Sequence, residues 1–142
     1  MKSSESRFNG CLYFSSNALA RKVAKLATES WKKVGLSPSH AYLLMIVLEQ
    51  PGVQPGAIAA EIHLTPSTIT RLIEKLEEKK LLVRTTDGKV TNVYATPKAK
   101  ALDPKMKECI VAFTQKYEEI LGAEETARVI QNINKLNDKL SA

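Results

Sequence analysis

Hydroxyl side chains gather beside an arginine near the middle of this chain. Residues 64–71 read LTPSTITR, and no acidic residue follows until Glu74. A hydroxyl can donate to a phosphate oxygen or bond a base edge, and a guanidinium offers paired planar donors to a base. A carboxylate among them would be repelled by phosphates. The side chains that carry this chemistry, with one lysine further along, are Thr65, Ser67, Thr68, Thr70, Arg71 and Lys75. The stretch therefore predicts contact with a polyanion.

A helix over about residues 65–80 is expected to present these groups. Thr65 is a suitable N-cap, and apolar residues recur after it at helical spacing. These inward positions are Ile69, Leu72, Ile73 and Leu76. The helix N-terminus, with its free N–H groups and positive dipole end, also suits a phosphate. Arg71 is the predicted base contact, and Lys75, one turn later, suits the phosphate backbone.

The neighbouring segments predict the support for this helix. Ser37-Pro38 is a helix start signal before the apolar segment 38–49, which is expected to be central and buried. Residues 54–64 form a short helix, and His63-Leu64 connects it tightly to the next one. Residues 82–95 read as a β-hairpin with Asp87-Gly88 as the turn signal. A helix–turn–helix followed at once by a hairpin is a winged helix.

The hairpin is the predicted wing, over residues 83–95. Arg84, Thr86 and Lys89 are the expected contacts to the adjacent DNA backbone or minor groove. Asp87 is a poor phosphate ligand, and its expected role is to accept hydrogen bonds from its own turn or to orient Lys89 or Arg84.

Long amphipathic helices are expected on both sides of the winged segment. They cover residues 8–34, 97 to about 121 and 124–140, and their apolar stripes are too extensive to remain exposed. We therefore expect them to interleave with a second copy. The predicted fold is mainly α, a winged helix-turn-helix with flanking long helices that form an intertwined dimerisation region. The predicted DNA-binding lobe is 36–96, and the helical dimerisation region is 1–35 plus 97–142.

Composition favours the same class of protein. The net charge of +6 makes nucleic acid the first partner to expect. No apolar window is long enough for a membrane span and no signal peptide is visible, so a cytoplasmic location without a membrane partner is expected. Cys11, Cys109 and the two histidines match no metal-ligand spacing, so neither a metal nor a cofactor is predicted. No catalytic triad, carboxylate pair or Gly-rich phosphate loop points to an enzyme.

The run STITRLIEKLEEKKLLVRTTDGKVTNVYAT resembles the recognition helix and wing of the multiple-antibiotic-resistance regulator (MarR) family. The positions that match the family pattern are Ser67, Thr68, Thr70, Arg71, Leu72, Leu76, Glu77, Leu81, Val83, Arg84, Asp87, Val93 and Thr96. The resemblance implies a homodimer on a palindromic operator, and usually repression relieved by a small ligand or oxidant. Two positions depart from the pattern. Lys80 replaces a glycine where a left-handed backbone is expected, and Lys89 replaces the wing arginine.

The resemblance also implies possible effectors. Family members often bind aromatic anions, and the candidate residues are Tyr13, Phe14, Trp31, His40 and Tyr42. An ordinary core and dimer interface is the alternative interpretation of these residues. Cys11 lies near the reactive cysteine of a peroxide-sensing branch, and Cys109 lies where two-cysteine members place a partner. The tyrosines expected beside such a thiol are missing.

The sequence thus predicts a DNA-binding transcriptional regulator, a repressor in the form that the resemblance implies. It acts as a homodimer on double-stranded DNA, and a small aromatic or anionic effector is the further partner. Two alternatives remain open: a thiol-based redox-sensing regulator, and a winged-helix protein-interaction module without DNA specificity.

Overall fold

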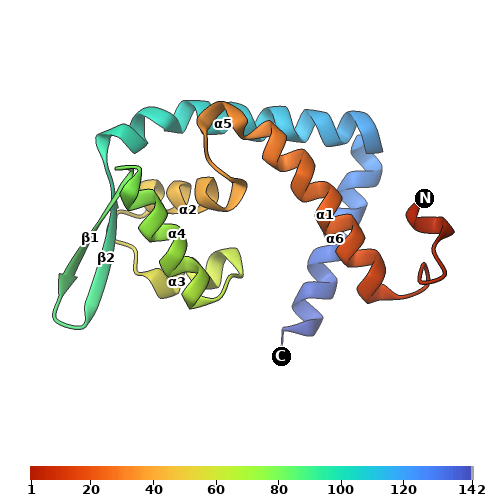
Figure 1. Ribbon diagram of the computed structural model, residues 1–142, viewed down its shortest axis with the longest axis horizontal. Helices are drawn as coiled ribbons and strands as arrows, with labels where there is room; N and C mark the ends of the chain where they lie inside the picture. The colour runs from red at the N-terminus through yellow and green to blue at the C-terminus, as the bar shows by residue number, and fades with distance from the viewer. Residues whose placement is uncertain (142) are drawn as a thin grey trace. The chain divides into compact units, whose positions relative to one another are not determined.

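The structure, a computed structural model, describes residues 1–141 and is mainly helical (Figure 1). Its elements in chain order are η1 (Ser3–Glu5), α1 (Leu12–Ser30), η2 (Lys32–Val34), α2 (Pro38–Glu49), α3 (Pro55–Ile62), α4 (Pro66–Glu78), β1 (Leu82–Asp87), β2 (Val90–Ala95), α5 (Pro97–Leu121) and α6 (Ala123–Leu140). The predicted winged helix-turn-helix in a mainly α fold is confirmed by this order. Within residues 1–141, no helix combines the length and apolar character needed to cross a membrane.

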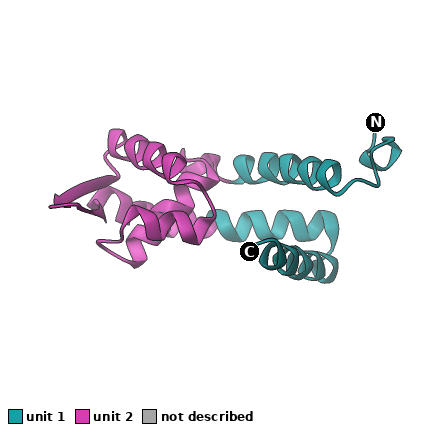
Figure 2. Cartoon of the chain, turned by 90° about the horizontal axis from the view of Figure 1, so that it is seen from below, with its two compact units in different colours: residues 1–30, 109–142 teal, residues 31–108 magenta. Residues whose placement is uncertain are grey.

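The chain divides into two compact units (Figure 2). Unit 1 comprises residues 1–30 and 109–142, and it contains η1, α1, the later part of α5, and α6. Unit 2 comprises residues 31–108, and it contains the helix–turn–helix and the hairpin. The predicted DNA-binding lobe, residues 36–96, lies inside unit 2.

The first long helix is shorter than the predicted range 8–34. It begins at Leu12, and residues before it fold into turns in which Asn9 Nδ2 donates to the carbonyl oxygen of Ser4 at 2.7 Å. Asparagine and glycine at positions 9 and 10 have low helix propensity, which accounts for the late start. After Ser30 the chain tightens into η2, which Gly35 ends with a φ of 69°. This left-handed glycine is the C-terminal cap.

The core of unit 2 is built around α2. Ser37 caps this helix by accepting a hydrogen bond from the backbone N–H of His40 at 3.3 Å, and Pro38 occupies its first turn. The fully buried large side chains of the winged helix come from every one of its elements, and include Leu43, Leu44, Val47, Ile58, Ile69, Ile73, Leu76, Leu82 and Val93. The helix of the opening stretch is therefore held by its apolar face.

The two strands form an antiparallel pair that runs from Leu82 opposite Ala95 to Asp87 opposite Val90. The turn between them consists of Gly88 and Lys89, one residue later than the predicted Asp87-Gly88 signal. Gly88 has a φ of 63°, whereas Lys89 is not among the residues with positive φ. A positive φ at only the first turn residue fits a type II′ turn, which favours glycine at that position. The position of Gly88 thus sets the register between β1 and β2.

Candidate nucleic-acid interface

The tip of α4 is organised by its capping threonine. The Thr65 hydroxyl accepts from the backbone N–H of Thr68 at 3.3 Å, and the first turn contains no acidic residue. The preceding connection turns sharply because His63 has a φ of 55°, in the left-handed region. This geometry confirms Thr65 as the N-cap and leaves the dipole of α4 uncompensated by protein carboxylates in that turn.

The faces of α4 separate apolar from polar side chains as predicted. Ile69, Ile73 and Leu76 are buried, and Leu72 is half-buried. On the other side, Ser67, Thr70, Arg71 and Lys75 are exposed, while Thr68 is half-buried. The helix thus presents the predicted DNA-binding groups of its first two turns on an accessible surface.

The hydroxyl groups of this tip also bond one another. Thr65 Oγ1 lies 2.9 Å from Thr68 Oγ1 and 3.3 Å from Ser67 Oγ, and Thr70 Oγ1 donates to the Pro66 carbonyl at 3.0 Å. A hydroxyl has one hydrogen to donate and two lone pairs that accept. While Thr70 donates to Pro66 it can only accept, which suits an amino group on a base better than a phosphate oxygen.

The tip of the wing is exposed and carries mixed charge. Thr86, Asp87 and Lys89 are exposed, and Lys89 lies in the turn itself. A lysine at the turn can contact a phosphate while the inner face of the hairpin stays away from the DNA. Within residues 1–141 no ion pair joins Asp87 to Lys89 or Arg84, so the role of orienting either cation has no contact in the structure.

Arg84 occupies a different setting from the other predicted wing contacts. Its Nη2 lies 2.7 Å from Glu77 Oε1 on α4, and both side chains are about one-third exposed, at 34% and 29%. Glu77 was not among the predicted site residues. The alternation of side chains along β1 could have indicated this contact, because it puts Arg84 on the same face as buried Leu82.

The end of α4 confirms the expected left-handed backbone at Lys80, whose φ is 61°. The exposed carbonyl groups at this end are bonded from α5 and the residue before it. Lys98 Nζ donates to the Lys79 carbonyl at 3.0 Å, and Thr96 Oγ1 donates to the Lys80 carbonyl at 2.8 Å. These bonds stabilise a non-glycine residue in a conformation that ordinarily costs roughly 1 kcal/mol.

Three of the five effector candidates lie in unit 2. Trp31 is fully buried and packs edge-on against Tyr42, with ring centroids 6.0 Å apart. Trp31 Nε1 and His40 Nε2 are buried without a hydrogen-bond partner among residues 1–141, and His40 Nδ1 lies 2.5 Å from Ser37 Oγ. Burial lowers the pKa of His40, and the charges of Lys79 and Lys75 lower it further. Two orphaned ring nitrogens are unusual for an ordinary core.

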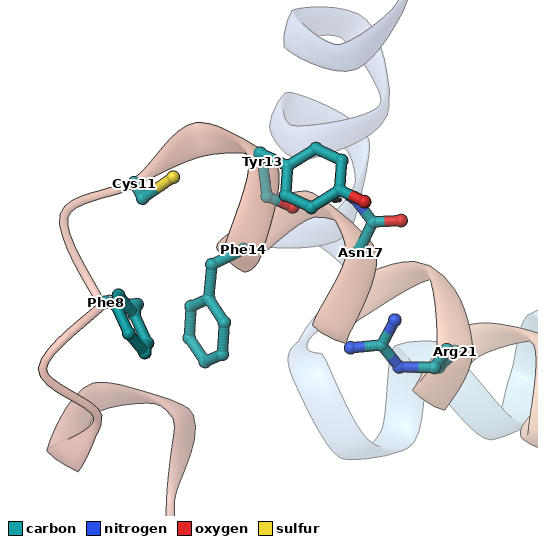
Figure 3. Close-up of a pocket in the computed structure, with 6 residues that line it drawn as sticks. All are labelled: Phe8, Cys11, Tyr13, Phe14, Asn17 and Arg21. Atoms are coloured by element: carbon teal, nitrogen blue, oxygen red, sulfur yellow. Dashed lines mark hydrogen bonds between the residues drawn. The ribbon is translucent and has the colours of Figure 1, made fainter.

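The other two candidates lie in unit 1, beside a shallow pocket at the start of α1 (Figure 3). The pocket has a volume of about 280 Å³ and is lined by Phe8, Cys11, Tyr13, Phe14, Asn17 and Arg21. The rings of Phe8 and Phe14 lie side by side, tilted by 50°, with centroids 6.2 Å apart. Cys11 is exposed, whereas Cys109 is buried at 1% exposure. No disulfide bond joins the two cysteines.

The sequence of this chain is similar to those of known transcriptional regulators. A sequence model of the MarR family matches residues 34–90, which span α2 to the turn of the hairpin. The chain is 26% identical over 117 residues to the HTH-type transcriptional repressor MdtR of Bacillus subtilis (strain 168), with 80% of this chain and 76% of that protein covered.

Solved structures share the fold over nearly the whole chain. CouR from Rhodococcus jostii RHA1, bound to p-coumaroyl-CoA, is 26% identical with a TM-score of 0.71, and the match covers 99% of this chain and 92% of that one. The S. aureus MepR–DNA complex is 19% identical with a TM-score of 0.75, covering 96% of this chain and 100% of that one, and this likeness shows the fold alone. Together with the winged helix-turn-helix described above, these matches show that the chain is similar to the MarR family of winged-helix transcriptional regulators.

Proposed function

We propose that this protein is a transcriptional repressor that binds a palindromic operator as a homodimer. The observation that carries the proposal is the tip of α4, where exposed hydroxyls and exposed Arg71 surround a helix N-terminus without acidic residues. Residues 65–80 enter the major groove with Arg71 against a base edge, while Lys75 and Lys89 contact phosphates. The similarity to MdtR, a transcriptional repressor, supports this function.

The dimeric state is supported by the apolar side chains that unit 1 leaves exposed. These include Leu12, Leu19, Val23, Ile110, Val111, Ile120, Leu121, Ile130, Ile133 and Leu136. A folded chain rarely exposes so many large apolar side chains on a few helices unless another surface covers them. A second copy of the same helices covers them with two-fold symmetry, and that symmetry matches a palindromic site.

The effector of the repressor is proposed to be an aromatic anion. The unpartnered Trp31 Nε1–H is a donor, and neutral His40 can donate from its unpartnered Nε2 when Nδ1 accepts from Ser37 Oγ. Tyr42 supplies an aromatic surface next to Trp31. CouR, whose structure contains p-coumaroyl-CoA, supports an aromatic ligand.

Selection of bound duplexes from a random pool tests the function directly. The expected product is a palindromic consensus whose half-sites are about one helical turn apart. Binding to that consensus should weaken at least about a hundredfold between about 50 and 200 mM salt, because phosphate contacts release counterions. A protein-interaction module would select no consensus, and its binding would hardly respond to salt.

Repeating the selection with peroxide separates the thiol-based alternative. A regulator that senses oxidation through Cys11 would lose the consensus under peroxide and keep it in a Cys11→Ser variant. The repressor proposed above keeps its consensus in both conditions, since Cys11 does not contact DNA in this function.

A further inference from the structure

We propose that Arg84 is a positioning residue that locks the wing to the recognition helix through Glu77, and is not a DNA contact. The inference rests on the proposed DNA-binding function. Its starting observation is the ion pair between Arg84 Nη2 on β1 and Glu77 Oε1 on α4, 2.7 Å apart. The sequence pattern alone places Arg84 among the wing cations, so the inference changes its role.

The direction of the Arg84 side chain follows from the register of the hairpin. Side chains alternate between the two faces of a strand, so Arg84 shares a face with Leu82. Its cross-strand partner is Val93, which lies on the same face and is fully buried. Leu82 is also buried, at 2% exposure. Arg84 therefore leaves the strand on the core side, where its stem covers apolar surface and its guanidinium reaches α4.

The ion pair completes a set of bonds around the junction between α4 and β1. On the backbone side, Thr96 N–H donates to the Leu81 carbonyl at 3.0 Å and Thr96 Oγ1 donates to the Lys80 carbonyl at 2.8 Å. These bonds hold the connection but do not reach the body of the hairpin beyond Leu82. The bond from Arg84 to Glu77 is the side-chain contact that ties the next part of β1 to the last turn of α4.

The charge of the pair also argues against a phosphate contact. Glu77 neutralises the guanidinium, so the pair has no net charge with which to displace counterions from DNA. If Arg84 moved to a phosphate, Glu77 would be left partly buried, unpaired and close to the DNA backbone. Keeping the pair closed avoids both costs.

Binding of the selected duplex by variants at several salt concentrations tests the inference. Glu77→Gln raises the net charge by one, so a simple electrostatic view expects tighter binding. Positioning predicts the opposite: Glu77→Gln and Arg84→Met each weaken binding by a similar factor, on the order of tenfold, with an unchanged slope of log K against log salt. The double variant should be no weaker than either single variant, because both remove the same contact. Lys89→Met serves as the matched control, and its slope should fall by about one.

The inference is overturned if Arg84→Met lowers the salt slope by about one, as a phosphate contact would, or if Glu77→Gln leaves binding unchanged or tightens it. Amide hydrogen exchange of the protein without DNA gives a readout that does not depend on the proposed function. Faster exchange of the β1 and β2 amides in both variants supports positioning, and unchanged exchange contradicts it. If the wild-type protein selects no duplex at all, the proposed function fails, whereas the exchange result still decides the role of Arg84.

Discussion

At the level of single residues, accessibility separates the side chains that can meet DNA from those that organise the protein. Arg71 and Arg84 are both arginines of the predicted interface, yet only Arg84 is held in an ion pair. Arg71 is exposed, and within residues 1–141 it has no ion-pair partner. Its guanidinium is thus available for a base, as the sequence predicts.

Replacing Arg71 by alanine should weaken binding to the selected operator by about ten- to a hundredfold, because a bidentate base contact contributes roughly 1–3 kcal/mol of discrimination. The preference for a base at one position of each half-site should relax. The thermal midpoint should not change, since Arg71 is exposed. Fluorescence anisotropy with single-base operator variants measures both effects. Arg128→Ala, at an exposed site on α6 in unit 1, is the control and should bind normally. Equal weakening on operator and random duplex would show a phosphate contact instead.

His40 should make the protein less stable at acidic pH. Its pKa in the folded state lies below the ordinary 6.5 because of burial and then the charges of Lys79 and Lys75. Above about pH 6.5 the residue is neutral in both states and contributes nothing through this linkage. As the pH falls below that value, the unfolded chain binds a proton that the folded protein does not, so the free energy of unfolding decreases until the folded pKa is reached.

The measurement is urea unfolding of the wild type and of His40→Gln at one protein concentration, at about pH 8 and about pH 5.5. The stability of the wild type relative to the variant should be lower at the acidic pH. The variant also loses the contact with Ser37. Above pH 6.5 that loss changes its free energy of unfolding by an amount that does not vary with pH. A difference between the two proteins that does not vary with pH would contradict this account.

At the level of elements, the junction of α4 and β1 shows how a helix can end without glycine. Lys80 adopts a φ of 61°, and its carbonyl is bonded by Thr96. Hydrogen bonds from a segment that follows the hairpin therefore hold the backbone of Lys80 in this conformation. The conformation is strained for a residue with a Cβ atom.

Lys80→Gly should stabilise the protein by roughly 0.5–1 kcal/mol, because glycine adopts the left-handed region without the steric cost of a Cβ atom. Lys79→Gly is the matched control: it removes the same charge at a φ of −79°, where glycine gives no relief and only adds freedom to the unfolded chain. That control should be destabilised. Thermal unfolding without DNA compares the two, and equal shifts in both variants would rule out backbone strain at Lys80.

At the level of the whole molecule, the two units divide their surfaces by character. Unit 2 buries most of its large apolar side chains, whereas the helices of unit 1 leave many exposed. On α6 the exposed apolar residues Ile130, Ile133 and Leu136 recur every three residues. A stripe of this kind along a helix indicates a face that another helix covers.

Ile133→Glu should break the proposed dimer, since it places a charge in an apolar contact that would have to be desolvated. Sedimentation equilibrium should give a dimer for the wild type and a monomer or unfolded chain for the variant. Gln131→Glu adds the same charge at another position of α6 and should remain dimeric. The unfolding temperature of the wild type should rise with protein concentration, as mass action requires for a dimer. A monomeric wild type at micromolar concentration would refute the dimer.

Short-range features of this protein could be predicted from its residues alone. The Thr65 cap, the buried face of α4, the Gly35 cap and the existence of the hairpin each depend on residues within a few positions of one another. Propensity and periodicity act over that range. The left-handed backbone at Lys80, by contrast, is expected only from the family pattern, which has a glycine at that position. The late start of α1 and the one-residue shift of the turn lie at element ends, where local preferences compete most closely.

Long-range pairing could not be predicted in this way. Whether Arg84 meets DNA or Glu77, whether Lys98 reaches the end of α4, and whether the nitrogens of Trp31 and His40 find partners all depend on how separate elements pack. Side chains from distant segments compete for the same partners. Distances of a few ångströms between elements decide which of these contacts forms. A sequence pattern contains no such distances. It therefore does not show whether Arg84 contacts a phosphate or forms an ion pair within the protein.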